Sequence, residues 1–95
     1  MKYNQEPIGG TVAAFLKASG LQSEYQAFKI RKRWREIAGT AINDQTTDVY
    51  YGKKILHVYI LSAPLRQQLF IYKEQYLKIL QEEFGENIVT AIQIH

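Results

Sequence analysis

The hydrophobic period changes near Thr46, and this change constrains the fold more than any other feature of the sequence. From there to residue 61, β-branched, aromatic and aliphatic side chains alternate along the chain, which is typical of β-strands. The segment Gly52-Lys53-Lys54 interrupts the alternation. The sequence therefore predicts strands at residues 46–51 and 55–61, joined as an antiparallel hairpin with a basic tip.

Outside this hairpin, apolar residues recur at the three- and four-residue spacing of helices. Pro7 suits the first turn of a helix, Ser23 is a residue type that caps helices, and Ser62-Ala63-Pro64 is a strong helix start. Gly39 and Gly85 suit helix ends. The prediction is helices at residues 7–19, 23–38 and 63–84, a short irregular or helical connection at 40–45, and a last strand at 88–94.

These elements follow one another in the order ααββαβ. We therefore expect one α+β domain over residues 1–95, with a three-stranded sheet packed by helices. Trp34 is the expected centre of its core. The other side chains expected to face the core are Ala27, Ile30, Ile37, Ala38, Leu56, Val58, Ile60, Leu65, Leu69, Phe70, Leu77, Leu80, Phe84, Ile88, Ile92 and Ile94.

Composition favours a folded, cytoplasmic protein. Hydrophobic residues make up 46% of the chain, enough apolar surface to offset the entropy lost on folding. The chain has no cysteine, whereas a secreted domain of this size commonly needs disulfides. No stretch approaches the roughly 18 apolar residues of a membrane span, and no apolar run follows the first residues. We expect neither export nor membrane insertion.

The sequence offers few residues for catalysis. Its two histidines, His57 and His95, have no partner at metal-ligand spacing, and His57 is interpreted first as an ordinary sheet histidine. The only adjacent carboxylates, Glu82 and Glu83, lie at an expected helix end, and no phosphate-binding loop or nucleophile motif is present. We predict a protein that is not an enzyme and uses no cofactor, metal or small-molecule substrate.

Positive charge is concentrated in the second expected helix. The segment between Tyr25 and Ile42 contains five cations and one carboxylate, which gives it a local charge of +4. The whole chain carries only +3. Such clustering is typical of a surface that binds phosphates, although a solvated helix face is an equal alternative. The candidate nucleic-acid-binding residues are Lys29, Arg31, Lys32, Arg33, Arg35, Lys53, Lys54 and Arg66.

Aromatic residues of the hairpin form the second candidate surface. Tyr50, Tyr51 and Tyr59 can stack on unpaired bases if they lie on an open sheet face, or they pack against a helix, which is the more common role. Alternatively, the outer face of the hairpin docks a protein partner or a second copy of the chain. The candidate partner-binding residues are Tyr50, His57 and Tyr59.

Three ordered segments carry a family resemblance: Trp34-Arg35-Glu36-Ile37-Ala38-Gly39, then Gly52 to Val58, then Ser62 to Leu69. Together they resemble the core domain of the bacterial DciA-like family, long catalogued as a domain of unknown function. The resemblance implies a KH-like fold, DNA binding, and a role in recruiting or loading the replicative helicase. It also implies that Trp34 and Gly39 are structural residues.

The residues and the resemblance lead to one leading hypothesis, a non-enzymatic accessory domain of bacterial DNA replication that contacts nucleic acid and the replicative helicase. Because the sequence contains no GxxG loop, binding of the KH type must use another surface. The alternative is a protein–protein interaction module without nucleic-acid binding.

Overall fold

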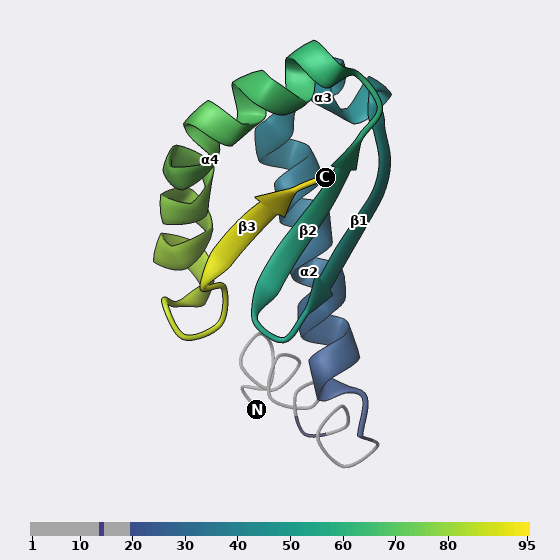
Figure 1. Ribbon diagram of the computed structural model, residues 1–95. Helices are drawn as coiled ribbons and strands as arrows, with labels where there is room; N and C mark the ends of the chain where they lie inside the picture. The colour runs from purple at the N-terminus through teal and green to yellow at the C-terminus, as the bar shows by residue number, and fades with distance from the viewer. Residues whose placement is uncertain (1–13, 15–19) are drawn as a thin grey trace.

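The computed structural model of the protein describes residue 14 and residues 20–95, and the helix expected at residues 7–19 lies outside these residues. The described elements follow the order α2, α3, β1, β2, α4, β3 (Figure 1). Their bounds are Gln22–Ala38 for α2, Thr40–Asp44 for α3, Thr46–Gly52 for β1, Ile55–Ile60 for β2, Ala63–Phe84 for α4 and Ala91–Ile94 for β3. The α+β class and the expected order of these elements are confirmed.

The three strands form one mixed sheet in the order β1-β2-β3. Strand β2 lies in the centre, antiparallel to β1 and parallel to β3. Helix α4 runs from the end of β2 back to the start of β3 (Figure 1). The pairing of Gly52 with Ile55 leaves a two-residue turn at Lys53 and Lys54. The expected hairpin is therefore confirmed, and its basic tip is as tight as an antiparallel hairpin allows.

One face of the sheet carries the core. Helix α2 packs mainly against β1 and α4 mainly against β3, and the two helices contact each other. Trp34 is completely buried and meets the Tyr76 ring edge-on at 5.2 Å between centroids. Leu56, Val58 and Ile60 are buried as expected, because alternation along β2 directs them towards the helices.

The other face of the sheet carries no helix among the described residues (Figure 1). Side chains of β1 and β2 that point away from the core therefore lie on an open surface. Tyr50 on β1 is 56% exposed and Tyr59 on β2 is 38% exposed. We call this surface, with Tyr50, His57, Tyr59 and His95, the open face.

Four residues in the described part of the chain were predicted to begin or end a helix, and three of them do so in the structure. Gly39 ends α2 with a φ of 87° and Gly85 ends α4 with a φ of 113°, both in the left-handed region that favours glycine. Ser62 caps α4 by accepting a hydrogen bond from the Leu65 backbone N–H at 3.4 Å. The prediction that Ser23 caps the second helix is wrong, because the helix begins one residue earlier and Leu21 stands at the cap position.

Two further expectations needed correction. Phe70 was expected in the core but is 58% exposed, because the wide apolar stripe of α4 extends beyond the area that the sheet covers. The last strand begins at Ala91 rather than at residue 88. Ile88 and Val89 instead lie in the turn after Gly85, where Val89 is completely buried and Ile88 packs against the core.

Candidate nucleic-acid interface

The five cations of α2 fall on two sides of the helix. At about 100° per residue, Lys29, Lys32 and Arg33 lie on the side that faces the end of α4, whereas Arg31 and Arg35 lie on the side that faces β1. We call the first side the groove side and the second the β1 side. The two sides differ in what surrounds their charges.

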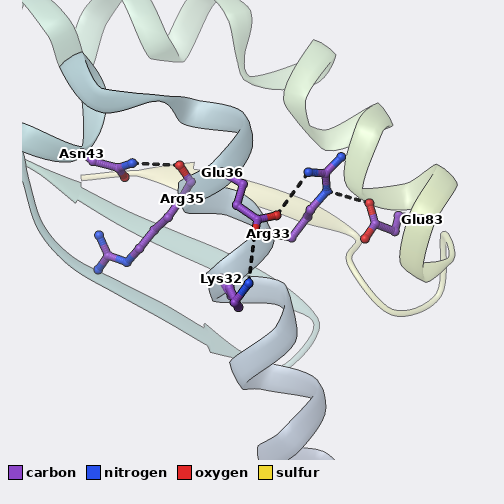
Figure 2. A network of polar contacts seen from close by, with 6 residues as sticks. All are labelled: Lys32, Arg33, Arg35, Glu36, Asn43 and Glu83. Carbon is purple, nitrogen blue, oxygen red and sulfur yellow. Dashed lines mark hydrogen bonds and ion pairs between the residues drawn. The ribbon is translucent and has the colours of Figure 1, made fainter. Parts of the chain in front are cut away.

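On the groove side, carboxylates neutralise two of the three cations (Figure 2). Lys32 Nζ lies 2.9 Å from Glu36 Oε2, and Arg33 Nη1 lies 3.3 Å from Glu36 Oε1. Arg33 Nε also donates to Glu83 Oε1 at 2.7 Å, which joins α2 to the last turn of α4. These two cations and two carboxylates carry no net charge, so less positive charge is available to a phosphate on this side of α2 than the sequence alone suggests.

The same contacts shift two pKa values. The pKa of Arg33 is raised, first by its hydrogen bond to Glu83 and then by the one to Glu36. The pKa of Glu36 is lowered, chiefly by the hydrogen bond from Lys32 and next by the one from Arg33. Each shift favours the charged form, so the network stays ionised at neutral pH.

An open groove of about 520 Å³ lies beside this network, between the first half of α2 and the end of α4. Tyr25 and Phe28 supply aromatic surface there, and the Lys29 ammonium lies 5.0 Å from the centre of the Tyr25 ring. A cation over an aromatic face is partly stabilised by the ring. Lys29 remains exposed and makes no ion pair within residues 20–95.

On the β1 side, the cations have no carboxylate within ion-pair distance among the described residues. The Arg35 guanidinium points away from Glu36, while the Arg35 carbonyl accepts a hydrogen bond from Asn43 Nδ2 at 2.8 Å (Figure 2). This bond fixes α3 against the end of α2. Arg31 lies one helical turn before Arg35, so two uncompensated guanidinium groups stand next to each other.

The hairpin tip is the second place where positive charge is uncompensated. Lys53 and Lys54 are both exposed, and neither makes an ion pair in the part of the chain that the structure describes. Both adopt a left-handed backbone, with φ of 53° and 67°. Thr90 anchors the tip, because its backbone N–H and its hydroxyl both donate to the Lys54 carbonyl, at 2.8 and 2.9 Å.

Arg66, the remaining candidate cation, serves the fold. Its Nη1 donates to the Ile60 carbonyl at 2.7 Å and to the Leu61 carbonyl at 3.4 Å. These bonds satisfy backbone acceptors where β2 ends and α4 begins. We therefore regard Arg66 as a connection between strand and helix, apart from the two uncompensated groups.

The open face brings together four aromatic rings. Successive ring centroids lie 5.8 Å apart from Tyr50 to His57, 5.2 Å from His57 to His95, and 4.5 Å from His95 to Tyr59. His57 Nδ1 and His95 Nε2 lie 3.0 Å apart and share a hydrogen bond. The structure thus places the three candidate partner-binding residues side by side and adds His95 between them.

Tyr51 does not belong to this group. It points to the helix side, where its hydroxyl donates to the Ile88 carbonyl and its ring packs against the core. Burial raises the pKa of the Tyr51 hydroxyl. Of the three tyrosines considered for base stacking, only Tyr50 and Tyr59 lie on the open face.

Residues 7–94 match the profile of the protein family described as Dna[CI] antecedent, DciA. The chain belongs to the DciA family. This family is associated with the replicative helicase in bacterial DNA replication, as the resemblance indicated. No curated protein and no solved structure matches the chain, so the KH-like label of the fold stays a prediction.

Several of the residues through which this chain resembles the DciA family are structural. Trp34, Leu56 and Val58 are completely buried and Leu69 nearly so. Gly39 ends a helix with a positive φ. The three segments also contain polar residues of the two candidate surfaces, namely Arg35, Lys53, Lys54, His57 and Arg66.

Two classes of site receive no support from the described residues. Within them, no group of three or more histidine, cysteine, aspartate or glutamate side chains is placed to hold a metal ion. None of the helices there is long and apolar enough to cross a membrane.

Proposed function

We propose that this domain is an accessory of the replicative helicase that binds nucleic acid through phosphate contacts. The binding surface comprises the β1 side of α2 and the hairpin tip, with Lys29 as a further contact. The observation that carries the proposal is that Arg31, Arg35, Lys53 and Lys54 have no carboxylate partner among residues 20–95. Such cations raise the affinity of a protein for DNA, because they displace the counterions condensed on the phosphates.

The chemistry of the surface defines the expected binding. Arginine and lysine contacts to phosphates fix a protein on the backbone without reading bases, so we expect little sequence preference. On duplex DNA the logarithm of the affinity falls with the logarithm of salt concentration, with a slope of about −0.9 per phosphate contact. Such binding keeps a helicase partner near DNA without selecting a site.

The strained tip supports the same conclusion. A non-glycine residue in the left-handed region costs about 1 kcal/mol or more, and two-residue hairpin turns normally use Asn-Gly or a similar pair. Lys53 and Lys54 both adopt this conformation. Strain at two consecutive lysines favours a role for their side chains, because glycine would form the same turn at lower cost.

Fluorescence anisotropy with a labelled DNA duplex across a salt series tests the proposal. We expect steeply salt-dependent binding, and we expect the double variant Arg31→Glu/Arg35→Glu to weaken it by tenfold or more and to flatten the salt slope. Lys78→Glu, an exposed charge reversal on α4, is the matched control and changes affinity little. Binding by the double variant equal to that of the wild type would reject this surface.

A protein-interaction module is the second candidate, and one observation favours it. Leu61 is 70% exposed just before α4, and Phe70 and Ile71, which are 58% and 66% exposed, line one hollow two turns into this helix. Apolar side chains gathered on a surface mark protein contacts, and such a contact is insensitive to salt. Ile71→Ser should weaken the association with purified helicase and leave DNA affinity unchanged; an unchanged helicase association would remove this candidate.

A further inference from the structure

The row of rings on the open face has the properties of a stacking platform. It crosses the three strands of the sheet, and its outer members, Tyr50 and Tyr59, are 56% and 38% exposed. We propose that the open face binds the unpaired bases of a single-stranded nucleic acid. This inference rests on the proposed function, to which it adds the class of substrate and the residues that contact it.

The rings are already ordered in the way that stacked bases require. Interplanar angles fall from 33° between Tyr50 and His57 to 24° between the two histidines and 15° between His95 and Tyr59. The hydrogen bond between His57 and His95 holds the middle of the row in place. Because the side chains are preorganised, a base that stacks on either end loses little additional conformational freedom of the protein.

The sheet geometry sets the position of Tyr50. A Cβ atom built on Gly52, two residues along the same strand, would lie 2.7 Å from Tyr50 Cζ, so the ring rests directly against the glycine backbone. A side chain at position 52 would therefore force the Tyr50 ring to move, although the φ of Gly52 is not in the left-handed region. The ring lies towards the hairpin tip.

Charge gives the open face a direction. The hairpin turn with Lys53 and Lys54 begins three residues after Tyr50, whereas Asp48 pairs with Tyr59 across the strands at the opposite end. Phosphates are attracted at the lysine end and repelled at the aspartate end. A single strand thus places its bases on the Tyr50 end of the row and its backbone along the two lysines, as in other stacking sites that combine rings with a positive groove.

The composition of the face favours bases over an apolar protein partner. Its exposed groups are phenol and imidazole rings, each with an apolar plane and a polar edge, and Gln93 and Thr47 extend the polar border. Rings of this kind accept the faces of bases regardless of sequence. The most exposed aliphatic side chains, Leu61 at 70% and Ile71 at 66%, are not part of this row of rings.

Two labelled strands of equal length separate base stacking from phosphate contact: an oligothymidylate, and an abasic strand with the same phosphates and no bases. We expect the wild-type domain to bind the oligothymidylate roughly tenfold more tightly than the abasic strand. Tyr50→Ala and Tyr59→Ala should remove most of this difference without changing affinity for the abasic strand or for a duplex. Tyr50→Phe, which keeps the ring, should retain it.

Two further variants control for side effects. Gly52→Ala displaces the Tyr50 ring without deleting it and should lower the oligothymidylate affinity several-fold, with the thermal unfolding transition still cooperative. Tyr72→Ala removes a tyrosine of similar exposure, 46%, from α4 and should leave all affinities unchanged.

The outcomes distinguish the inference from the proposed function. Equal affinity for the two single strands, or tyrosine variants that match the wild type, would overturn base stacking while phosphate binding stands. Absence of binding to every strand, duplex included, would overturn both. Tyrosine variants that bind all strands normally but lose the helicase would also overturn the inference, and would assign the open face to protein contact.

Discussion

The two sides of α2 carry similar numbers of cations and differ in their surroundings. On the groove side, Lys32 and Arg33 are held by Glu36 and by Glu83, which lies fifty residues further along the chain than Arg33. On the β1 side, Arg31 and Arg35 have no such partner within residues 20–95. The comparison teaches that the local charge of a sequence segment overstates the charge available to a ligand, because tertiary contacts neutralise part of it.

The largest effect of uncompensated charge is expected at the hairpin tip. Lys53→Gly/Lys54→Gly removes two uncompensated cations and also the left-handed strain. We expect duplex affinity to fall roughly fivefold and the free energy of unfolding to rise by about 1 kcal/mol, measured by anisotropy and by urea denaturation.

A matched variant separates the two effects at the tip. Lys53→Gln/Lys54→Gln removes the charges and keeps side chains in the left-handed region, so affinity should fall to the same extent without a gain in stability. If the glutamine variant bound like the wild type, the lysine charges would have no part in binding.

A smaller effect is expected at the carboxylate that joins the helices. Glu83→Gln removes one partner of Arg33 and releases part of its charge, so duplex affinity should rise by about twofold. Glu82→Gln, one residue earlier and without an ion pair to a described residue, serves as the control for net charge. Equal gains in the two variants would mean that net charge, and not release of Arg33, sets the affinity.

The smallest effect concerns pH. Because the folded protein lowers the pKa of Glu36, this carboxylate contributes stability above the ordinary glutamate pKa, and the contribution is lost as the pH falls from there through the lowered pKa. Glu36→Gln should therefore unfold at a slightly lower denaturant concentration than the wild type at pH 7, with the difference shrinking in acid. A difference that stayed constant down to acidic pH would contradict the ion-pair explanation.

Much of the fold could be predicted because its signals are local. The alternation from Thr46, the Ser62 cap and the glycines at positions 39 and 85 each act on their own neighbours in the chain. The exposure of Phe70 could not be predicted in this way, because it depends on how far the sheet extends beside α4. The start of α2 at Gln22 could not be predicted either, because Leu21 at the cap position makes no capping side-chain hydrogen bond.

The candidate site was predicted less completely. Sequence reasoning found the cations and the tyrosines but could not pair Arg33 with Glu83, since that contact forms only when the ends of two helices meet. It also missed His95. Alternation along β3 was the available indication, because it places residues 91, 93 and 95 on one face, but only the parallel pairing with β2 brings His95 beside His57 and Tyr59.

The parallel pairing of β3 with the central strand also has a consequence for how the chain folds during synthesis. β2 has β1 as its neighbour early, but its second edge stays unpaired until α4 has formed and residues 91–94 have been made. Val89 and Ile92, both almost fully buried, are added to the core at the same late stage. Because contacts so distant in sequence form slowly, the domain completes its core only after these residues have left the ribosome.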